Sequence, residues 1–197
     1  MIETSSFIKS FPGLFEKYSS LAPWQITGSL QNILIEIIAG LDDVFVIKDG
    51  IAIHKTAAIE SGVVLKAPAI IGEQCFLGSN AYLRGGVYLD NNVKIGTGCE
   101  IKTSIIFSNS AIAHFNFIGD SIIGGNVNFE AGAITANHFN ERENKNIEVV
   151  YNSEIIHSGA QKFGSLVGDG SKIGANAVLS PGTVLLPGAI VKRLELV

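Results

Sequence analysis

The sequence predicts an all-β solenoid in which short strands wind into a triangular prism. Over residues 53–135 a large aliphatic residue returns almost every six positions, and a small or slim residue stands two places before each one. Amphipathic helices repeat near 3.6 residues and simple strands near 2, so a sustained period of six fits neither. The 22 glycines and the low share of charged residues, 16%, also suit tight corners around a buried axis.

The repeat predicts which residues face the axis. Three hexads make one coil of about 18 residues, with the large aliphatic side chain pointing inward. The inward residues expected before the first irregularity are Ile53, Ile59, Leu65, Ile71, Leu77, Leu83, Leu89, Ile95 and Ile101. The period then shortens to five twice, before Ile106 and before Ile123. We expect each deletion to tighten a corner without ending the stack.

Residues 1–50 do not repeat, and we interpret them as a helical N-terminal cap. Residues 28–38 place apolar side chains on one helical stripe, with Ser29 as the expected N-cap and Gly40 at the C-terminal end. Terminal units of a solenoid must shield its core, which favours a cover over the open end. The alternative is an element for dimerisation or for shaping a substrate site.

Two hairpins are expected. Residues 44–53, with Asp49-Gly50 at their centre, predict a hairpin that leads into the first coil. The period is lost over residues 137–164 and returns at Val167, so this segment is an insertion within one β-helix that spans residues 51–197. Its alternating strand at 147–151 indicates a hairpin arm. The arm is either a simple excursion from a corner or an element that reaches a neighbouring subunit or a substrate.

Composition excludes several classes of protein. A net charge of −4 provides no basic surface for nucleic acid. Residues 31–40 are apolar but too short for a membrane span, and no charged segment precedes an apolar run as in a signal peptide, so we expect a cytoplasmic protein. Cys75 and Cys99 fall at slim inward positions, which predicts buried thiols, with a disulfide between coils as the alternative.

Two cations stand one coil apart. Arg84 and Lys102 are 18 residues apart and each follows an inward aliphatic residue. Since coils rise by roughly 4.8 Å, the two side chains should stack on one corner and point outward. Without an interposed acid they repel each other, and a phosphate is their natural partner. The alternative is a pair of solvated surface cations.

Polar residues of other chemistry follow on the next coils. His114 lies two places after an inward Ile, on a different wall of the coil that follows Lys102. Asn128 and Asn137 come next, although Asn is also common at corners because it tolerates a left-handed backbone. Side-by-side packing of three prisms would create clefts between subunits in which these groups converge.

Several segments resemble one known family. They are residues 83–84, 100–102, 113–120 and 126–137, and they are similar to the acetyltransferase domain of bifunctional N-acetylglucosamine-1-phosphate uridyltransferase/glucosamine-1-phosphate acetyltransferases. Residues 161–169 resemble the archaeal-type branch of sugar-1-phosphate nucleotidyltransferases. The resemblance covers roughly residues 50–195. Its most specific part is the run from His114 to Asp120, followed by Ile-Thr-Ala-Asn at 134–137.

The resemblance implies a left-handed parallel β-helix, a homotrimer with its active site between subunits, and transfer from acetyl-CoA in UDP-N-acetylglucosamine biosynthesis. It implies that His114 is the general base, a role that a neutral imidazole near pH 7 suits. It also implies that Arg84 and Lys102 hold the sugar phosphate, and that Asn137 contacts the acetyl group and the developing oxyanion.

The remaining site residues also follow from the resemblance. Asn128 matches a sugar-phosphate contact, Lys145 in the arm matches a further phosphate ligand, and Ala131 and Ala175 fall where the pantetheine lies along the backbone. Phe117 takes the place of a substrate-binding Tyr, which removes one hydrogen bond to the sugar phosphate.

Two further departures concern His138 and the start of the repeat. His138 follows Asn137 where an aromatic residue or Leu is more usual. No glycine-rich nucleotide loop precedes the repeat, so we expect acetyl transfer without nucleotidyl transfer.

We therefore expect an acetyl-CoA-dependent N-acetyltransferase that acts on an amino-sugar 1-phosphate similar to glucosamine-1-phosphate. One alternative is a zinc hydro-lyase of the γ-carbonic-anhydrase type, which needs three converging His ligands. The four His present lack a close pair at the required spacing, so we expect no metal. The other alternative is a non-catalytic trimeric scaffold or sugar-nucleotide-binding protein. The joint presence of Arg84, Lys102, His114 and Asn137 favours the enzyme.

Overall fold

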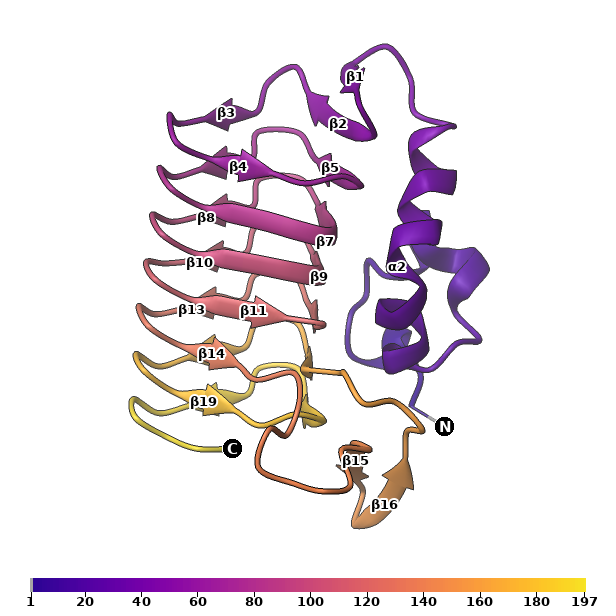
Figure 1. The fold of residues 1–197 in the computed structure, drawn as a ribbon, viewed down its shortest axis with the longest axis vertical. Helices are drawn as coiled ribbons and strands as arrows, with labels where there is room; N and C mark the ends of the chain where they lie inside the picture. Colours follow the sequence, from indigo (N-terminus) through magenta and orange to yellow (C-terminus); the bar gives the residue numbers. More distant parts are fainter. Residues whose placement is uncertain (1) are drawn as a thin grey trace.

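The computed structural model describes residues 2–197 as a stack of short parallel strands with a helical segment along one side (Figure 1). A 7-stranded sheet forms one wall of the stack, and a 12-stranded sheet folds around a corner to form the other two. The architecture is the left-handed parallel β-helix of hexapeptide repeats that the sequence predicts.

The strands of successive coils pair in register and define three walls. Wall 1 consists of β2 (Ile51–His54), β5 (Ala69–Ile71), the C-terminal parts of β7 (Tyr82–Leu89) and β9 (Glu100–Ile106), β12 (Ile122–Ile123), β17 (Ser165–Val167) and β20 (Thr183–Leu185). Wall 2 consists of β3 (Ala58–Ile59), β6 (Phe76–Leu77), β8 (Lys94–Ile95), β10 (Ala111–Ile112), β13 (Asn128–Phe129), β18 (Lys172–Ile173) and β21 (Ile190–Val191). Wall 3 consists of β4 (Val64–Leu65), the N-terminal parts of β7 and β9, β11 (Phe117–Gly119), β14 (Ile134–Thr135) and β19 (Val178–Leu179).

The predicted inward residues form the core. From Ile71 to Ile101 every predicted inward aliphatic side chain is buried, and the period that resumes at Val167 supplies buried residues down to Val191. The exceptions are Ile53 and Leu65, which are half-buried, and Ile59, which is 38% exposed, because all three lie in the first coil and no coil precedes it. Cys75 and Cys99 are buried free thiols, as expected, and burial raises the pKa of the Cys75 thiol to about 11.

Each five-residue step tightens the corner between wall 3 and wall 1. In β7 this corner contains Gly85 and Gly86, both at positive φ, and β9 passes it with one residue fewer. Buried serines replace the usual slim aliphatic residue at the tightened corner. The backbone N–H of Ser121 donates to Ser104 Oγ at 3.0 Å, and that of Ser165 donates to Ser121 Oγ at 3.0 Å. The stack continues through both steps, as predicted.

The N-terminal helices differ from the prediction in their boundaries. They are η1 (Thr4–Ser6), α1 (Pro12–Phe15), η2 (Glu16–Tyr18) and α2 (Pro23–Ile38). Helix α2 begins at Pro23 instead of after Ser29, because Pro suits the first helical position and the Gln25 side chain accepts a hydrogen bond from Ala22 N–H at 2.9 Å. Its C-cap is Ala39, one residue before the expected Gly40.

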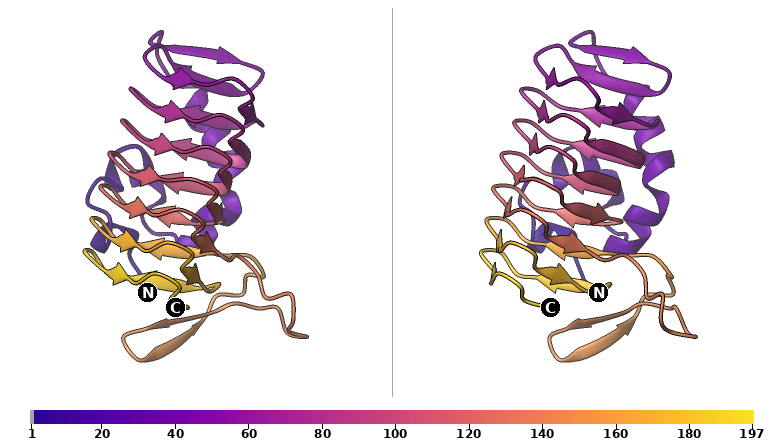
Figure 2. Two further views of the ribbon diagram at one scale, coloured as in Figure 1. Left: turned by 90° about the vertical axis from the view of Figure 1, so that its left-hand side faces the viewer. Right: turned by 60° about the vertical axis from the view of Figure 1, so that its left-hand side comes forward.

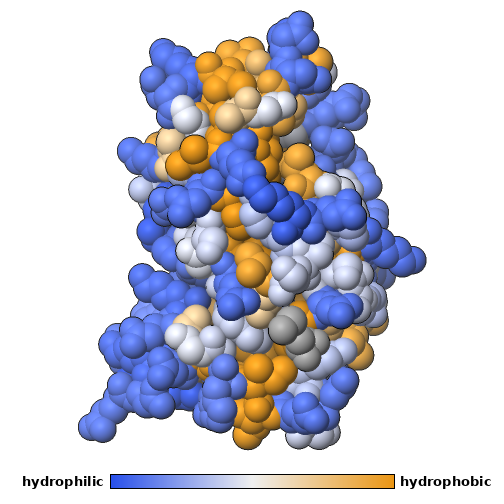
Figure 3. Space-filling view, turned by 90° about the vertical axis from the view of Figure 1, so that its right-hand side faces the viewer, coloured by the Kyte–Doolittle hydropathy of each residue, from blue (hydrophilic) through white to orange (hydrophobic). Residues whose placement is uncertain are grey.

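The predicted cap does not cover the open end of the β-helix. Helix α2 instead runs along wall 1, beside β5, β7 and β9 (Figures 1 and 2). The physical reason is that the outward positions of wall 1 are apolar and need a cover. They form one buried cluster with the helices, which includes Ile70, Tyr88, Ile105, Ile122, Leu166, Phe11, Phe15, Leu30 and Leu34. Figure 3 shows the outer side of this cover, where hydrophilic side chains flank a broken band of hydrophobic atoms.

Both predicted hairpins are present. β1 (Phe45–Lys48) pairs antiparallel with β2 through Asp49 and Gly50, which have φ values of 50° and 77°. In the arm, β15 (Glu148–Tyr151) pairs with β16 (Glu154–His157), and β15 packs against β20. Because Ile147 and Val149 join the buried cluster on wall 1, the arm extends the helical cover over the last coils. No helix among residues 2–197 is long and apolar enough to span a membrane.

The lateral cover leads to a stability prediction. Leu34 is fully buried against wall 1, whereas its neighbour Ile35 is 58% exposed on the same helix. Leu34→Ala should lower the free energy of unfolding by about 2–5 kcal/mol, because it leaves a cavity between helix and wall. Ile35→Ala, the matched control, should change it by about 0.5 kcal/mol or less. Denaturant titration followed by circular dichroism measures both, and equal effects would contradict the packing described here.

Candidate functional site

The stacked cations lie where the sequence predicts, but each has its own carboxylate. Arg84 pairs in register with Lys102 at the end of wall 3. The Arg84 guanidinium lies 2.6 Å from Glu100 Oε1, and Lys102 Nζ lies 2.5 Å from Asp120 Oδ2. The expectation that no acid stands between the cations was therefore wrong. Glu100 could have been identified from the sequence, because it is two residues before Lys102 and so faces the same way.

The two ion pairs differ in burial. The side chains of Lys102 and Asp120 are 15% and 9% exposed, whereas those of Arg84 and Glu100 are 38% and 33% exposed. The Arg84 guanidinium also lies 5.8 Å from the centre of the Tyr82 ring. Lys102 has three donor hydrogens and Arg84 five, so each can bind a further anion while it keeps its carboxylate.

Asn137 and His138 complete this corner. The Asn137 side chain is buried, and its Nδ2 donates to the same Asp120 oxygen that accepts from Lys102. Asn137 Oδ1 lies 3.2 Å from His138 Nδ1, and the His138 side chain is exposed. We call Lys102, Asp120, Asn137 and His138 the corner cluster.

Phe117 lies on wall 3 next to the corner cluster. It pairs in register with Glu100 and its ring lies over Gly119, where an added Cβ would approach the ring to 2.7 Å. Gly119 in turn pairs with Lys102. The structure thus brings Arg84, Lys102, Phe117 and Asn137 to one end of one wall.

His114 lies at the opposite end of wall 3, at its corner with wall 2. His114 follows β10 in the chain, and its side chain is exposed. The next residue, Phe115, has a φ of 56°. Ala131 and Ala175 continue the same column: Gly132 N–H donates to His114 O at 2.9 Å and Asn176 N–H donates to Ala131 O at 3.0 Å. Within one chain, the width of wall 3 separates His114 from the corner cluster.

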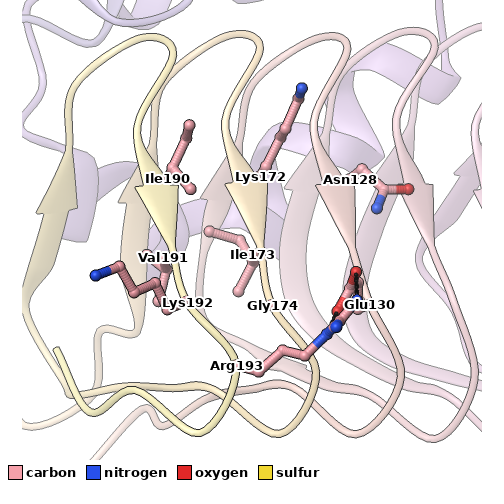
Figure 4. Close-up of a pocket in the computed structure, with 9 residues that line it drawn as sticks. All are labelled: Asn128, Glu130, Lys172, Ile173, Gly174, Ile190, Val191, Lys192 and Arg193. Carbon is pink, nitrogen blue, oxygen red and sulfur yellow. Dashed lines mark hydrogen bonds and ion pairs between the residues drawn. The ribbon is translucent and has the colours of Figure 1, made fainter.

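An open groove of about 650 Å³ lies on the outer face of wall 2, next to that column. Asn128, Glu130, Lys172, Lys192 and Arg193 line it, with bare backbone at Gly174 (Figure 4). Arg193 binds Glu130 through two hydrogen bonds of 2.8 and 2.9 Å (Figure 4). The Arg193 guanidinium and then the Ala175 N–H lower the pKa of Glu130 to about 2.

The groove has a net positive charge. Glu130 and Arg193 neutralise each other, and within residues 2–197 neither Lys172 nor Lys192 makes an ion pair. The sequence reasoning missed these cations, although each lysine stands beside an inward aliphatic residue as Arg84 does. Asn128 belongs to this groove and does not lie with Arg84 and Lys102.

Two other expectations concern Lys145 and metals. Lys145 is exposed in the segment between β14 and β15, and no ion pair or hydrogen bond joins it to Arg84 or Lys102. Among residues 2–197 no group of three or more His, Cys, Asp or Glu is arranged to hold a metal ion. The three converging ligands that a zinc hydro-lyase would need are therefore not brought together here.

Comparisons with known proteins point to one kind of domain. Residues 68–103 match the family model described as bacterial transferase hexapeptide (six repeats). A bifunctional sugar-1-phosphate nucleotidylyltransferase/acetyltransferase of Sulfurisphaera tokodaii is 35% identical over 152 residues, which covers 74% of this chain and 37% of that protein. The bifunctional protein GlmU of Methanococcus maripaludis is 44% identical over 70 residues, which covers 36% of this chain and 16% of that protein.

Both relatives extend well beyond the region that matches this chain. The chain spans 37% and 16% of the lengths of the two relatives, so their complete activities do not transfer to it. A solved GDP-perosamine N-acetyl transferase from Caulobacter crescentus, in complex with CoA and GDP-perosamine, covers 71% of this chain and 50% of its own at 15% identity. Its TM-score is 0.28.

The difference in burial between the two ion pairs leads to a prediction. Asp120→Asn leaves the Lys102 ammonium largely buried without a counter-charge, and should lower the free energy of unfolding by about 3 kcal/mol. Glu100→Gln removes the partner of the more exposed Arg84 and should cost less than about 1 kcal/mol. Chemical denaturation at neutral pH distinguishes the two. A larger loss for Glu100→Gln would show that the corner cluster does not have the burial described.

Proposed function

Because the chain belongs to the hexapeptide-repeat transferases, we propose that it moves an acetyl group from acetyl-CoA to the amine of an amino-sugar 1-phosphate. The observation that carries the proposal is the placement of the predicted residues on this scaffold. Arg84, Lys102 and Asn137 share one corner, while His114 heads the Ala131–Ala175 column at the other. The printed name of the Sulfurisphaera relative, a sugar-1-phosphate nucleotidylyltransferase/acetyltransferase, supports a sugar phosphate as the acceptor.

We propose that the active site forms between subunits of a homotrimer. The corner cluster and His114 lie at opposite ends of wall 3, so a second copy must bring its own His114 corner to the Lys102 corner. Wall 1 is covered by the chain's own helices and arm. Walls 2 and 3 remain for contacts with neighbours, and closed rings of identical chains make such contacts repeat.

The groove on wall 2 fits the phosphates of acetyl-CoA. Its unpaired Lys172 and Lys192 provide cations for a polyanion. In the register of β10, β13, β18 and β21, Lys192 lies three coils below Ala113, the residue that precedes His114. At roughly 4.8 Å per coil this separation is about 14 Å along the prism. An extended pantetheine arm along Ala131 and Ala175 would span it, with the thioester at His114 and the phosphates at the lysines.

The proposed reaction needs positioning, one base and one oxyanion donor. The acceptor amine forms a bond to the acetyl carbonyl carbon, the carbon–sulfur bond breaks, and the CoA thiolate leaves. His114 Nε2 or Nδ1 accepts the proton that the amine loses. Arg84 and Lys102 hold the sugar phosphate in reach. Asn137 has a second amide hydrogen, beyond the one that Asp120 accepts, for the developing oxyanion.

The finer assignments follow from the same proposal. An acceptor similar to glucosamine-1-phosphate would place the protein in UDP-N-acetylglucosamine biosynthesis in the cytoplasm. Phe117 would contact the acceptor, and Lys145 would contribute from the arm, whereas Asn128 lies in the wall 2 groove that is proposed for acetyl-CoA. Lys145 would reach a phosphate only if residues 138–146 approach a neighbouring subunit.

A specific observation favours the second candidate, a non-catalytic trimeric scaffold or sugar-nucleotide-binding protein. Both cations already have carboxylates, and the Asn137 amide already donates to Asp120. In the corner cluster, Lys102 and the Asn137 amide therefore already have a partner within the protein when no ligand is bound. Calorimetry with acetyl-CoA separates the two candidates, because a scaffold that has lost the activity should not bind it.

The base assignment predicts the behaviour of one variant. His114→Ala should lower kcat for CoA release by about 10²–10⁴-fold, which is the usual contribution of a positioned base. The assay would use glucosamine-1-phosphate as the acceptor and would measure the thiol of the released CoA. His157→Ala is the matched control, because His157 is an exposed His on the arm, and it should leave kcat unchanged. Unchanged turnover in His114→Ala would reject His114 as the base.

The groove predicts a different kinetic change. The double variant Lys172→Ala/Lys192→Ala should raise the KM for acetyl-CoA about tenfold and leave the KM for the acceptor unchanged. Lys94→Ala provides the control, since Lys94 occupies the same outward position on wall 2 but lies outside the groove. A rise in the acceptor KM instead would assign the groove to the acceptor.

A further inference from the structure

His138 is held by a chain of hydrogen bonds that begins at a charged pair. Asp120 Oδ2 accepts hydrogen bonds from Lys102 Nζ and from Asn137 Nδ2. Asn137 Oδ1 then faces His138 Nδ1 at 3.2 Å. Because the Asp120 and Asn137 side chains are buried, this chain leaves little freedom for the amide.

The chain determines which nitrogen of His138 carries the proton. An aspartate beside a lysine ammonium can only accept hydrogen bonds, so the amide NH₂ of Asn137 must face Asp120. Asn137 therefore presents its oxygen to the imidazole, and an oxygen acceptor requires a proton on His138 Nδ1. In the neutral ring Nε2 then keeps its lone pair, on a side chain that is exposed.

His54 and His157 have different partners at Nδ1, and His114 lies at the opposite end of wall 3 from the corner cluster. His54 Nδ1 accepts a hydrogen bond from the backbone N–H of Thr56 at 3.2 Å, so its proton must lie on Nε2. His157 Nδ1 lies 3.3 Å from the Glu148 carboxylate on the exposed hairpin. Among the described residues, His138 is thus the imidazole whose neutral tautomer is set by a buried network at the Lys102 corner.

We infer that His138 is a specificity-determining residue: its Nε2 accepts a hydrogen bond from a hydroxyl or amine of the acceptor substrate held at Lys102. The ligand class is a small polar molecule that combines an anionic group for Lys102 with a neutral donor for His138, as in a sugar phosphate. The substrate part of this inference rests on the proposed function, whereas the tautomer of His138 does not.

The first test observes the tautomer directly. Long-range ¹H–¹⁵N spectra of the labelled protein in alkaline buffer, where the rings are neutral, should show His138 in the Nδ1–H form and His54 in the Nε2–H form. In Asn137→Ala, His138 should become a mixture of the two tautomers while His54 is unchanged. A wild-type His138 in the Nε2–H form overturns the inference, whatever the activity of the protein.

The second test measures kinetics with glucosamine-1-phosphate and acetyl-CoA. His138→Phe keeps a planar ring without nitrogen, and should raise the acceptor KM about tenfold, the loss expected for one hydrogen bond. The kcat and the KM for acetyl-CoA should stay unchanged. His157→Phe is the control and should alter none of the three. An unchanged acceptor KM, or an equal effect of His157→Phe, overturns the inference.

The two proposals fail in different ways. If the wild-type protein acetylates no amino-sugar phosphate, the proposed function is wrong and the substrate part of this inference is wrong with it. If wild-type transfer is observed but His138→Phe has the wild-type acceptor KM, the proposed function stands and the inference about His138 falls. Circular dichroism of each variant confirms that a changed KM does not come from loss of the fold.

Discussion

The in-register pairing of successive coils is the constraint on which this structure depends. Each coil repeats the preceding one at roughly the spacing of adjacent strands, so a residue's place in the repeat sets its height and its wall. Arg84 stands over Lys102, and Lys102 over Gly119, because their backbones pair. Functional side chains therefore do not depend on mobile loops for their relative positions. A rigid scaffold of this kind suits chemistry that relies on positioning.

The corner between walls 3 and 1 shows how small departures from the period build a site. Each lost residue brings polar groups into a turn that otherwise contains glycine or slim aliphatic residues. The buried Ser104 and Ser121 hydroxyls satisfy backbone donors there, and Asp120 lies at the second turn with a φ of 46°. Buried polar groups need such partners, since an unpaired one costs roughly 1–3 kcal/mol. The corner cluster is thus part of the stability of the fold as well as a candidate site.

The helical segment determines which surfaces are left for other molecules. Wall 1 has apolar side chains on its outer face, and α2 and the arm bury them. In a prism with three faces this leaves walls 2 and 3, on which the cationic groove, His114 and the corner cluster are found. A site shared between copies is consistent with this division, because His114 and Lys102 lie at opposite ends of the same uncovered wall.

The sequence by itself determined the solenoid, its inward residues and the stacking of Arg84 on Lys102. A six-residue period is a local signal, and the position of a residue within its hexad indicates whether its side chain points inward or outward. It also determined the two hairpins, since left-handed residues such as Gly50 mark turns locally. It placed the helical segment at the wrong surface, since an apolar helix face does not say which apolar surface it covers.

Only the tertiary structure decided the partners of the polar groups. Asp120 meets Lys102, Asn137 reaches Asp120 from the next coil, and Arg193 reaches Glu130 across 63 positions of the chain. These contacts depend on side-chain directions and on how the insertion at 137–164 leaves its corner, and neither is encoded in the period. The pairing of Asp120 with Lys102, and the tautomer that we infer for His138, therefore follow only from the folded chain, whereas Glu100 is already indicated by its place two residues before Lys102.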